Sequence, residues 1–414
     1  MMNKGFMIAA TASGVGKTTI ARGLMALLTR KGYKVQPYKC GPDYIDTKFH
    51  HRVCGRPSIN LDTFMASKEH VRHLFGRYGQ DADIRIVEGM MGVFDGYDRL
   101  RGSSAEIARV LGLSVVLVVD AEHSAYSTAA LLEGFKTFDA GIWIAGVIFN
   151  KVGSERHRKM LLEACEDINM QCFGFVPKDA ALEQSSRYLG LDFSEPADNE
   201  RLLQLLEENV DWQRLLEIET DSEPVENSRW ERLPQRMVCA RNEESFSFIY
   251  QETIDRYERV EYFDPEREEP RLESGDLLYL PGGYPEKHLA ALTANEACRR
   301  AVRDFVEGGG EVVAECGGMM YLCNSVVDDE GEYAMCGVLP YTVSARRADR
   351  HLSLGYRRFE LDGMEYRGHE FHYTQFAGEQ PESAAQVYDA KGNPVPSPII
   401  KYKNVVASYI HFEK

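Results

Sequence analysis

Residues near the start of the chain have the types and spacing of a phosphate-binding loop. The sequence ATASGVGKT occupies positions 10–18, at the end of the apolar run 6–10. Small residues let backbone N–H groups close around phosphates, Lys17 adds a positive charge, and the Thr18 hydroxyl can hold Mg²⁺. Thr11 stands where the strict pattern has its first glycine, and a turn that only caps a helix is the alternative. The residues expected to bind the nucleotide are Ser13, Gly14, Val15, Gly16, Lys17, Thr18 and Thr19.

Acidic residues follow two further probable strands. Asp43 and Asp46 come after the probable strand 34–39 and a Gly-Pro turn, and Glu88 ends the apolar strand 84–87. Oxygen ligands of this kind suit Mg²⁺, which shares substrate phosphates. The alternatives are a turn with a helix cap for the two aspartates and a structural glycine loop for positions 89–96.

One side-chain amide is a candidate for recognition of the base. The apolar run 142–149 ends at Asn150. An amide offers both a donor and an acceptor and could read the edge of adenine. Asn at the end of a strand is also a common turn residue, so both interpretations stay open.

A second kind of chemistry is indicated by Cys316. It lies between the apolar run 311–315 and a Gly-Gly pair, where a strand-to-helix elbow would expose the sulfur and the helix N-terminus would lower the thiol pKa. Backbone N–H groups of Gly282, Gly283 and Gly317 could bind an oxyanion. His411, after the run 405–410, is the candidate base. A buried cysteine and an ordinary histidine are the alternative for each residue alone, but their occurrence with both glycine turns favours a nucleophilic site.

The elements that must position these residues follow the pattern of parallel α/β domains. Strands are expected at 6–10, 84–87, 115–120 and 142–149, with helices at 18–30, 104–111 and 128–138. This order predicts a sheet with helices on both faces and functional residues at the carboxyl ends of its strands. A second series of strands is expected at 237–240, 276–280 and 311–315, followed by short strands and turns from 337 onward. The fold class is therefore α/β with two domains, each a mostly parallel sheet: 1–195, a linker region 196–235, and 236–414.

Composition limits the partners of this 414-residue chain. It is 44% hydrophobic and 27% charged, as in soluble globular proteins, and its formal charge of −16 argues against broad nucleic-acid or anionic-membrane surfaces. Nine cysteines without a CxxC pair favour a reducing compartment. The apolar run at the N-terminus is too short to span a membrane, so we expect a cytoplasmic protein. The oligomeric state stays open, a homodimer being one alternative.

Together these motifs resemble the cobyrinic acid a,c-diamide synthases over nearly the whole chain. The matching segments, in order, are TASGVGKTT, KCGPDYIDTKFH, EGMMGVFDG, NKVGSERH, ARNEESFSFIY, PGGYPE, ECGGMMYL, RGHEFHYT and ASYIH. The resemblance implies a dethiobiotin-synthetase-like, phosphate-loop domain that binds ATP, followed by a class I glutaminase-like domain.

The resemblance also implies roles for single residues. Lys17 and Thr18 would contact ATP and Mg²⁺, with Asp43 and Glu88 as further metal ligands. Cys316 would be the nucleophile and His411 its base. The residues expected at the corrinoid and its acyl phosphate are Lys39, Asp43, Tyr44, Ile45, Asp46 and Asp95.

Two segments depart from the family pattern. Many members end in H-x-H, whereas this chain has His411-Phe412-Glu413, and Glu413 is therefore a candidate third member of a triad. The usual Arg-His-Leu-Gly-Leu is Arg-Tyr-Leu-Gly-Leu at positions 187–191, which affects expected substrate contacts.

The function implied is ATP- and glutamine-dependent amidation of the a and c carboxylates of cobyrinic acid through an acyl phosphate, with ATP and Mg²⁺ as cofactors. The same chemistry on Ni-sirohydrochlorin or hydrogenobyrinic acid is the nearest alternative. A regulatory or partitioning ATPase is the alternative of another class. Ala12 stands where sandwich-dimer ATPases carry a lysine, which counts against that class.

Overall fold

The computed structural model describes residues 4–179, 200–218, 220 and 232–413. The chain divides into two compact units, Met1–Ser228 and Arg229–Lys414, and each is described by itself. The α/β prediction is confirmed, because each unit is built around a mostly parallel sheet. Within the described ranges no helix combines the length and apolar character needed to cross a bilayer.

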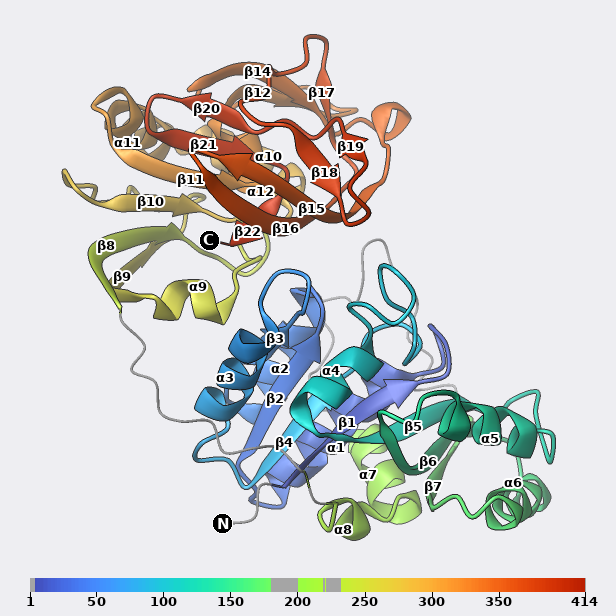
Figure 1. Cartoon of the computed structure of the whole chain (residues 1–414). Helices are drawn as coiled ribbons and strands as arrows, with labels where there is room; N and C mark the ends of the chain where they lie inside the picture. Colours follow the sequence, from blue (N-terminus) through green and yellow to red (C-terminus); the bar gives the residue numbers. More distant parts are fainter. Residues whose placement is uncertain (1–3, 180–199, 219, 221–231, 414) are drawn as a thin grey trace. The chain divides into compact units, whose positions relative to one another are not determined.

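The first unit contains a parallel sheet with the strand order β3-β2-β4-β1-β5-β6-β7 (Figure 1). Its strands are apolar along most of their length because both faces of the sheet are covered, as expected for parallel strands. The order brings the ends of β2, β4 and β1 side by side. The strands are β1 (Gly5–Ala10), β2 (Val35–Cys40), β3 (Ile59–Leu61), β4 (Ile84–Glu88), β5 (Ser114–Asp120), β6 (Trp143–Val152) and β7 (Cys172–Pro177).

Helices connect these strands, and their ends follow capping rules. Helix α4 begins after Ser103, whose hydroxyl accepts from the N–H of Glu106, and ends at Gly112 in a left-handed conformation. The helices are α1 (Lys17–Arg30), α2 (Ile45–Cys54), α3 (Lys68–Tyr78), α4 (Ser104–Leu111), α5 (Thr128–Phe138), α6 (Glu155–Asp167), α7 (Glu200–Asn209) and α8 (Trp212–Leu215).

The range 196–235, assigned to a linker by its sequence, contains α7 and α8. Leu202 and Leu206 of α7 are buried in the core of the first unit. They pack so closely on Gly23 of α1 that a Cβ at this glycine would collide with both side chains. Helix α7 therefore stabilises the first unit by burying apolar surface.

The second unit has a central sheet in the order β20-β21-β11-β10-β8-β9, parallel except for β20. Its strands are β8 (Leu233–Ala240), β9 (Tyr257–Phe263), β10 (Leu277–Leu280), β11 (Glu311–Glu315), β20 (Ile400–Tyr402) and β21 (Val405–Ser408). Its helices are α9 (Gln251–Asp255), α10 (Leu289–Ala294), α11 (Glu296–Glu307) and α12 (Gly317–Leu322), with 3-10 turns η2 (Pro285–Lys287) and η3 (Arg347–Asp349).

Two smaller sheets complete the second unit. Two of their strands, β12 and β13, precede residue 337, where the region of short strands and turns was expected to begin, and the others follow it. One has the order β13-β12-β14-β17, and the antiparallel other has the order β19-β18-β15-β16-β22. Their strands are β12 (Cys323–Val327), β13 (Glu332–Ala334), β14 (Leu339–Ser344), β15 (Ser353–Leu361), β16 (Met364–His372), β17 (Gln375–Ala377), β18 (Val387–Asp389), β19 (Pro394–Val395) and β22 (His411–Glu413).

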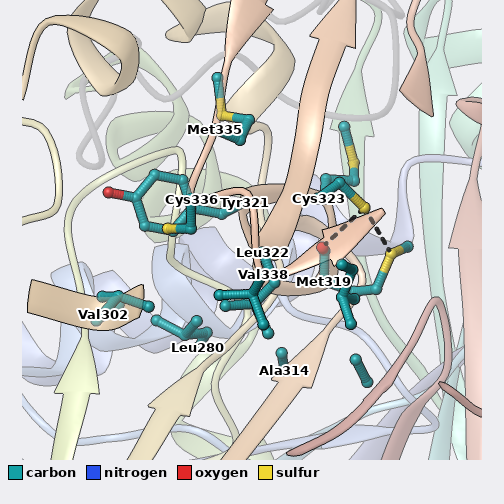
Figure 2. Close-up of a cluster of buried hydrophobic side chains, with 14 of the residues drawn as sticks. Leu280, Val302, Ala314, Met319, Tyr321, Leu322, Cys323, Met335, Cys336 and Val338 are labelled. Atoms are coloured by element: carbon teal, nitrogen blue, oxygen red, sulfur yellow. Dashed lines mark hydrogen bonds between the residues drawn. The ribbon is translucent and has the colours of Figure 1, made fainter. Parts of the chain in front are cut away.

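The core of the second unit surrounds helix α12. Leu280 of β10, Ala314 of β11 and Val302 of α11 belong to the same buried cluster as Tyr321 of α12 (Figure 2). At the end of the helix, the thiol of Cys323 donates to the backbone oxygen of Met319 at 3.4 Å. This packing fixes the helix that directly follows Cys316.

Candidate functional site

The phosphate loop joins β1 to α1 in a conformation that requires glycine. Gly14 and Gly16 have φ angles of 80° and 94°, in the left-handed region that glycine adopts without strain. Gly16 is the N-cap residue of α1. The side-chain amide of Asn150, at the end of the parallel strand region of β6, donates to the backbone oxygen of Val15 at 2.9 Å. Asn150 thus lies against the loop that the sequence assigned to phosphates.

Glu88 lies at the centre of a buried charge cluster at the ends of β1, β2 and β4. Its Oε1 accepts from Lys17 Nζ at 2.7 Å and from the Thr18 hydroxyl at 2.6 Å. Lys39 Nζ lies 3.0 Å from the same oxygen and also pairs with Asp46. The strand order of the sheet explains this meeting, because parallel strands end at the same edge.

The charged groups of this cluster shift one another's pKa values. Burial alone would raise the pKa of Glu88, but Lys17, Lys39 and His50 together outweigh it and hold the pKa well below the usual range. Burial lowers the pKa of Lys17, an effect that Glu88 partly offsets. Burial raises the pKa of Asp46 to about 6, and the neighbouring carboxylates act in the same direction. Glu88 is thus held ionised while Asp46 can take up a proton near neutral pH.

The two aspartates after β2 occupy different environments. Asp43 Oδ1 accepts from the N–H groups of Ile45 and Asp46, each at 2.8 Å, in the turn that leads into helix α2. Asp46 Oδ2 lies 3.5 Å from the Thr18 hydroxyl. Of the two carboxylates, Asp46 is the one with a contact to Thr18. Tyr44, between them, is buried.

The glycine loop after β4 is held by Asp95. Its Oδ2 accepts from the N–H of Gly92 at 3.0 Å. A Cβ on Gly92 would lie 2.5 Å from the same oxygen, so a side chain there would displace the Asp95 carboxylate. The family resemblance implies a substrate role for Asp95. In the structure, its hydrogen bond to Gly92 also holds the loop in shape.

His50 of α2 is a member of the cluster that the sequence reasoning missed. Its Nε2 lies 2.7 Å from Glu88 Oε2, and its Nδ1 lies 3.0 Å from the hydroxyl of Ser58. The ring is fully buried. Only its place in the segment KCGPDYIDTKFH could have drawn attention to it, because helix periodicity gives no sign of a carboxylate partner.

A pocket of about 370 Å³ adjoins the phosphate loop. This volume is within the range of small-molecule sites. Its walls come from the phosphate loop, the ends of β6 and β7, and α7. The residues that line it are Gly14, Gly16, Thr19, Ile20, Asn150, Lys151, Val176, Pro177, Lys178, Asp179 and Leu202. Four of the predicted nucleotide residues thus face one cavity.

The donor set beside the loop fits Mg²⁺ that is shared with a nucleotide. Within the described residues, no three His, Cys, Asp or Glu side chains form a metal cluster. Mg²⁺ usually keeps several waters and uses only one or two carboxylates together with phosphates, so such a cluster is not needed. Thr18, Glu88 and Asp46 bring a hydroxyl and two carboxylates together. Asp43, the other predicted ligand, is engaged with backbone N–H groups through Oδ1.

In the second unit, Cys316 forms the predicted elbow between β11 and α12. Its φ and ψ angles of 46° and −105° are strained for a residue with a side chain. Its N–H donates to the backbone oxygen of Ser408 on β21 at 2.7 Å. A strained conformation of this kind is typical of nucleophile elbows.

The expected lowering of the thiol pKa is wrong. Burial, followed by the carboxylate of Glu286, raises the pKa of Cys316, and the N–H of Gly317 offsets only part of this effect. The pKa of Glu286 is itself raised to about 6 by burial. Formation of a thiolate therefore needs a base that takes up the proton.

The predicted glycines bring the thiol and the imidazole together. A Cβ on Gly282 would collide with the ring of His411, lying 3.0 Å from Nε2, and would lie 3.2 Å from the Cβ of Cys316. A Cβ on Gly317 would lie 3.2 Å from the backbone nitrogen of Gly283. The structure thus brings together Cys316, His411 and all three glycines assigned to an oxyanion site.

Buried polar side chains surround His411. Its ring stacks on His369 with a centroid separation of 5.1 Å. Burial, followed by His411, lowers the pKa of His369 well below its usual value. Nδ1 of His411 lies 3.4 Å from Oε2 of Glu315, the residue directly before the nucleophile. Sequence reasoning treated Glu315 only as a strand residue and missed this contact.

Two predicted features fall partly or wholly outside the described structure. Glu413 is part of β22, where its backbone pairs with Arg367 of β16, but its side chain is not among those described. Positions 187–191, which depart from the family pattern, lie outside the described residues. The proposed roles of these positions stay predictions.

Comparisons with known proteins cover both units. Residues 6–190 match the CobQ/CobB/MinD/ParA nucleotide binding domain, and residues 239–413 match the CobB/CobQ-like glutamine amidotransferase domain. The cobyrinate a,c-diamide synthase of Caldanaerobacter subterraneus subsp. tengcongensis is 37% identical, over 98% of this chain and 94% of its own. The hydrogenobyrinate a,c-diamide synthase of Brucella anthropi is 37% identical, over 99% and 98%.

A third relative and a solved structure extend the comparison. The cobyrinate a,c-diamide synthase of Archaeoglobus fulgidus is 36% identical, over 89% of this chain and 85% of its own. Chloroplast FtsY from Physcomitrella patens is 16% identical, covers 44% of this chain and 60% of its own, and has a TM-score of 0.33. Such a low score carries no argument about the fold.

Proposed function

The chain belongs to the family of cobyrinate and hydrogenobyrinate a,c-diamide synthases, and from this premise we propose that it amidates the a and c carboxylates of cobyrinic acid with ATP and glutamine. It is an enzyme of the glutamine-hydrolysing carbon–nitrogen ligase type. The observation that carries the proposal is the elbow of Cys316 with His411 over Gly282. This arrangement supports nitrogen release from glutamine.

In the second unit, Cys316 Sγ attacks the side-chain amide carbon of glutamine while His411 takes the thiol proton. The tetrahedral intermediate collapses, the carbon–nitrogen bond breaks, and His411 returns the proton to the departing ammonia. Water then attacks the thioester and releases glutamate and the thiol. The N–H groups of Gly283 and Gly317 would stabilise the oxyanion in both steps.

In the first unit, a substrate carboxylate attacks the γ-phosphorus of ATP, and ADP leaves. Ammonia then attacks the carbonyl carbon of the acyl phosphate, inorganic phosphate departs, and the nitrogen loses its extra proton. Activation is required because a carboxylate is a poor acyl donor. Lys17 and the loop N–H groups would bind the phosphates, and Asn150 would face the adenine.

Mg²⁺ would be held by Thr18, Glu88 and either Asp46 or Asp43. When bound, it neutralises charge on the phosphates. The remaining candidates for contact with the substrate are Lys39, Tyr44, Ile45 and Asp95. We place the reaction in the cytoplasm, because all nine cysteines are free thiols.

Hydrogenobyrinic acid is the second candidate substrate, because relatives named for either acid are 37% identical to this chain. The test offers purified protein cobyrinic acid, hydrogenobyrinic acid or Ni-sirohydrochlorin with ATP and glutamine, and measures product masses. We expect two carboxyl-to-carboxamide conversions of cobyrinic acid, absent when ATP is omitted. Turnover of only another tetrapyrrole would change the substrate, and absence of glutamine hydrolysis under all conditions would overturn the function.

A further inference from the structure

Glu315 ends β11 and directly precedes the nucleophile elbow. Its side chain is only 4% exposed. Side chains alternate along a strand, so Glu315 and Val313 point to the opposite face of the sheet from Ala314, which lies in the core of Figure 2. Val313 packs in the same cluster as Tyr279 of the neighbouring β10. Glu315 therefore points away from the core around α12 and toward Tyr279.

Three groups approach the carboxylate of Glu315. The Tyr279 hydroxyl donates to Oε2 at 2.9 Å, and the N–H of Phe412 donates to Oε1 at 3.3 Å. Nδ1 of His411 lies 3.4 Å from Oε2. A carboxylate removed from water is costly unless donors surround it, and both of these donors hold Glu315 beside His411.

The two nitrogens of the His411 ring face different partners. Nε2 lies on the side of Gly282, where the Cβ of Cys316 is also found. Nδ1 lies on the side of Glu315. If Nδ1 carries a proton toward the carboxylate, Nε2 has a lone pair for the thiol proton. The geometry thus specifies one tautomer as the productive one.

We propose that Glu315 is the positioning residue that accepts from His411 Nδ1 and stabilises the imidazolium while Cys316 is a thiolate. The inference rests on the proposed glutaminase function and assigns to Glu315 the place that the sequence suggested for Glu413. Catalytic hydrogen bonds are often long before substrate binds, so the 3.4 Å separation fits this role. One strand end then carries both the nucleophile and the group that aligns its base.

The test measures kcat and KM for glutamine in Glu315→Gln and Glu315→Asp. The amide side chain introduced by Glu315→Gln carries no charge, and it offers one acceptor oxygen to the three groups that approach the carboxylate. We expect kcat to fall by ~10²-fold or more, as for a triad carboxylate replaced by its amide, with a smaller change in KM. Glu315→Asp keeps the charge and should recover part of kcat.

Asp276→Asn is the matched control. Asp276 is also a buried carboxylate of the second unit, held by Arg236 at 2.6 Å, but it directly precedes β10 at the end of that strand opposite Gly282. It should lower stability without the selective loss of kcat. Ammonia-dependent amidation should persist in every variant.

The possible outcomes distinguish failure of the positioning role of Glu315 from failure of the proposed glutaminase function. A folded Glu315→Gln protein with kcat close to wild type overturns the positioning role. If that variant does not fold, a Glu315→Asp protein with wild-type kcat overturns it instead, since the shorter side chain withdraws the carboxylate. If Cys316→Ser hydrolyses glutamine at the wild-type rate, Cys316 is not the nucleophile, and if the wild-type protein hydrolyses no glutamine, the glutaminase function itself fails.

Discussion

At the scale of single residues, the surroundings favour the ionised form of Glu88 in one site and the neutral form of Cys316 in the other. Lys17, Lys39 and His50 together keep the pKa of the buried Glu88 far below its usual range. At Cys316, burial and then the carboxylate of Glu286 raise the pKa of the thiol. An ionised Glu88 is available to a cation, whereas the thiol needs a base before it can react. The place of His411 beside Gly282, on the side where the Cβ of Cys316 also lies, therefore makes it the candidate for that base.

Cys316→Ser should abolish glutamine-dependent amidation and leave ammonia-dependent amidation intact. A serine hydroxyl is a far weaker nucleophile toward an amide, while the proposed ligase chemistry uses residues of the first unit. Product formation is measured with each nitrogen source in turn. Equal loss of both activities would contradict the division of labour and would mean that Cys316 supports folding.

Glu286→Gln should speed alkylation of Cys316 at pH 8. The pKa of Glu286 is raised to about 6, so its carboxyl group is ionised at pH 8 and disfavours a neighbouring thiolate. Removing that charge lowers the thiol pKa and increases the thiolate fraction. The rate constant for iodoacetamide is measured between pH 5 and pH 9. At pH 5, where the wild-type carboxyl is mostly protonated, the two proteins should differ less, and an equal difference at both pH values would contradict the charge effect.

At the scale of elements, sequence patterns correctly predicted helices and strands whose limits depend on residues close together in the sequence. The helices expected at 104–111 and 128–138 are α4 and α5, and the strand expected at 311–315 is β11. Apolar runs and caps determine these ranges. The acidic composition of 196–235 concealed α7, whose few leucines pack on a helix far away in the sequence.

Contacts between distant segments are the part of the site that sequence patterns did not reveal. His50 meets Glu88 only because α2 packs on β2, whose neighbour in the sheet is β4. Glu315 meets His411 only because β21, which leads to His411, pairs with β11. Neither residue has a neighbour in the sequence that indicates its partner. In contrast, Lys17, Thr18 and Gly16 were identifiable because a phosphate loop is a continuous segment.

Gly282→Ala should lower glutamine-dependent turnover by ~10²-fold or more, while ammonia-dependent turnover persists. A Cβ at this position would collide with the imidazole of His411, and displacement of a catalytic group by about 1 Å can cost this much. Gly331→Ala is the control in the same unit, because a Cβ there meets no atom within 4 Å. Steady-state rates with glutamine and with ammonia check the prediction. Equal rates for the two variants would mean that the close approach at Gly282 has no catalytic importance.

At the scale of the whole molecule, each unit has its own core and its own reactive cluster. The charges around Glu88 come from strands of the first sheet, and the elbow with its base comes from the second. A substitution should therefore act on the half of the reaction that its unit performs. Loss with one nitrogen source indicates the glutaminase unit, and loss with both indicates the ligase unit.

Lys17→Ala and Glu88→Gln should remove ATP-dependent amidation with either nitrogen source. Lys17 is the cation of the phosphate loop, and Glu88 joins it to the Thr18 hydroxyl, so both variants lose groups that would bind the nucleotide and its metal. Lys31→Ala is the control, since Lys31 follows the same helix and pairs with Glu207 away from the loop. Rates are measured with glutamine and with ammonia. Retention of more than about a tenth of the wild-type rate would contradict a role worth ~1.4 kcal/mol in the transition state. Loss with glutamine alone would place the defect in the other half of the reaction and would separate these residues from ATP chemistry.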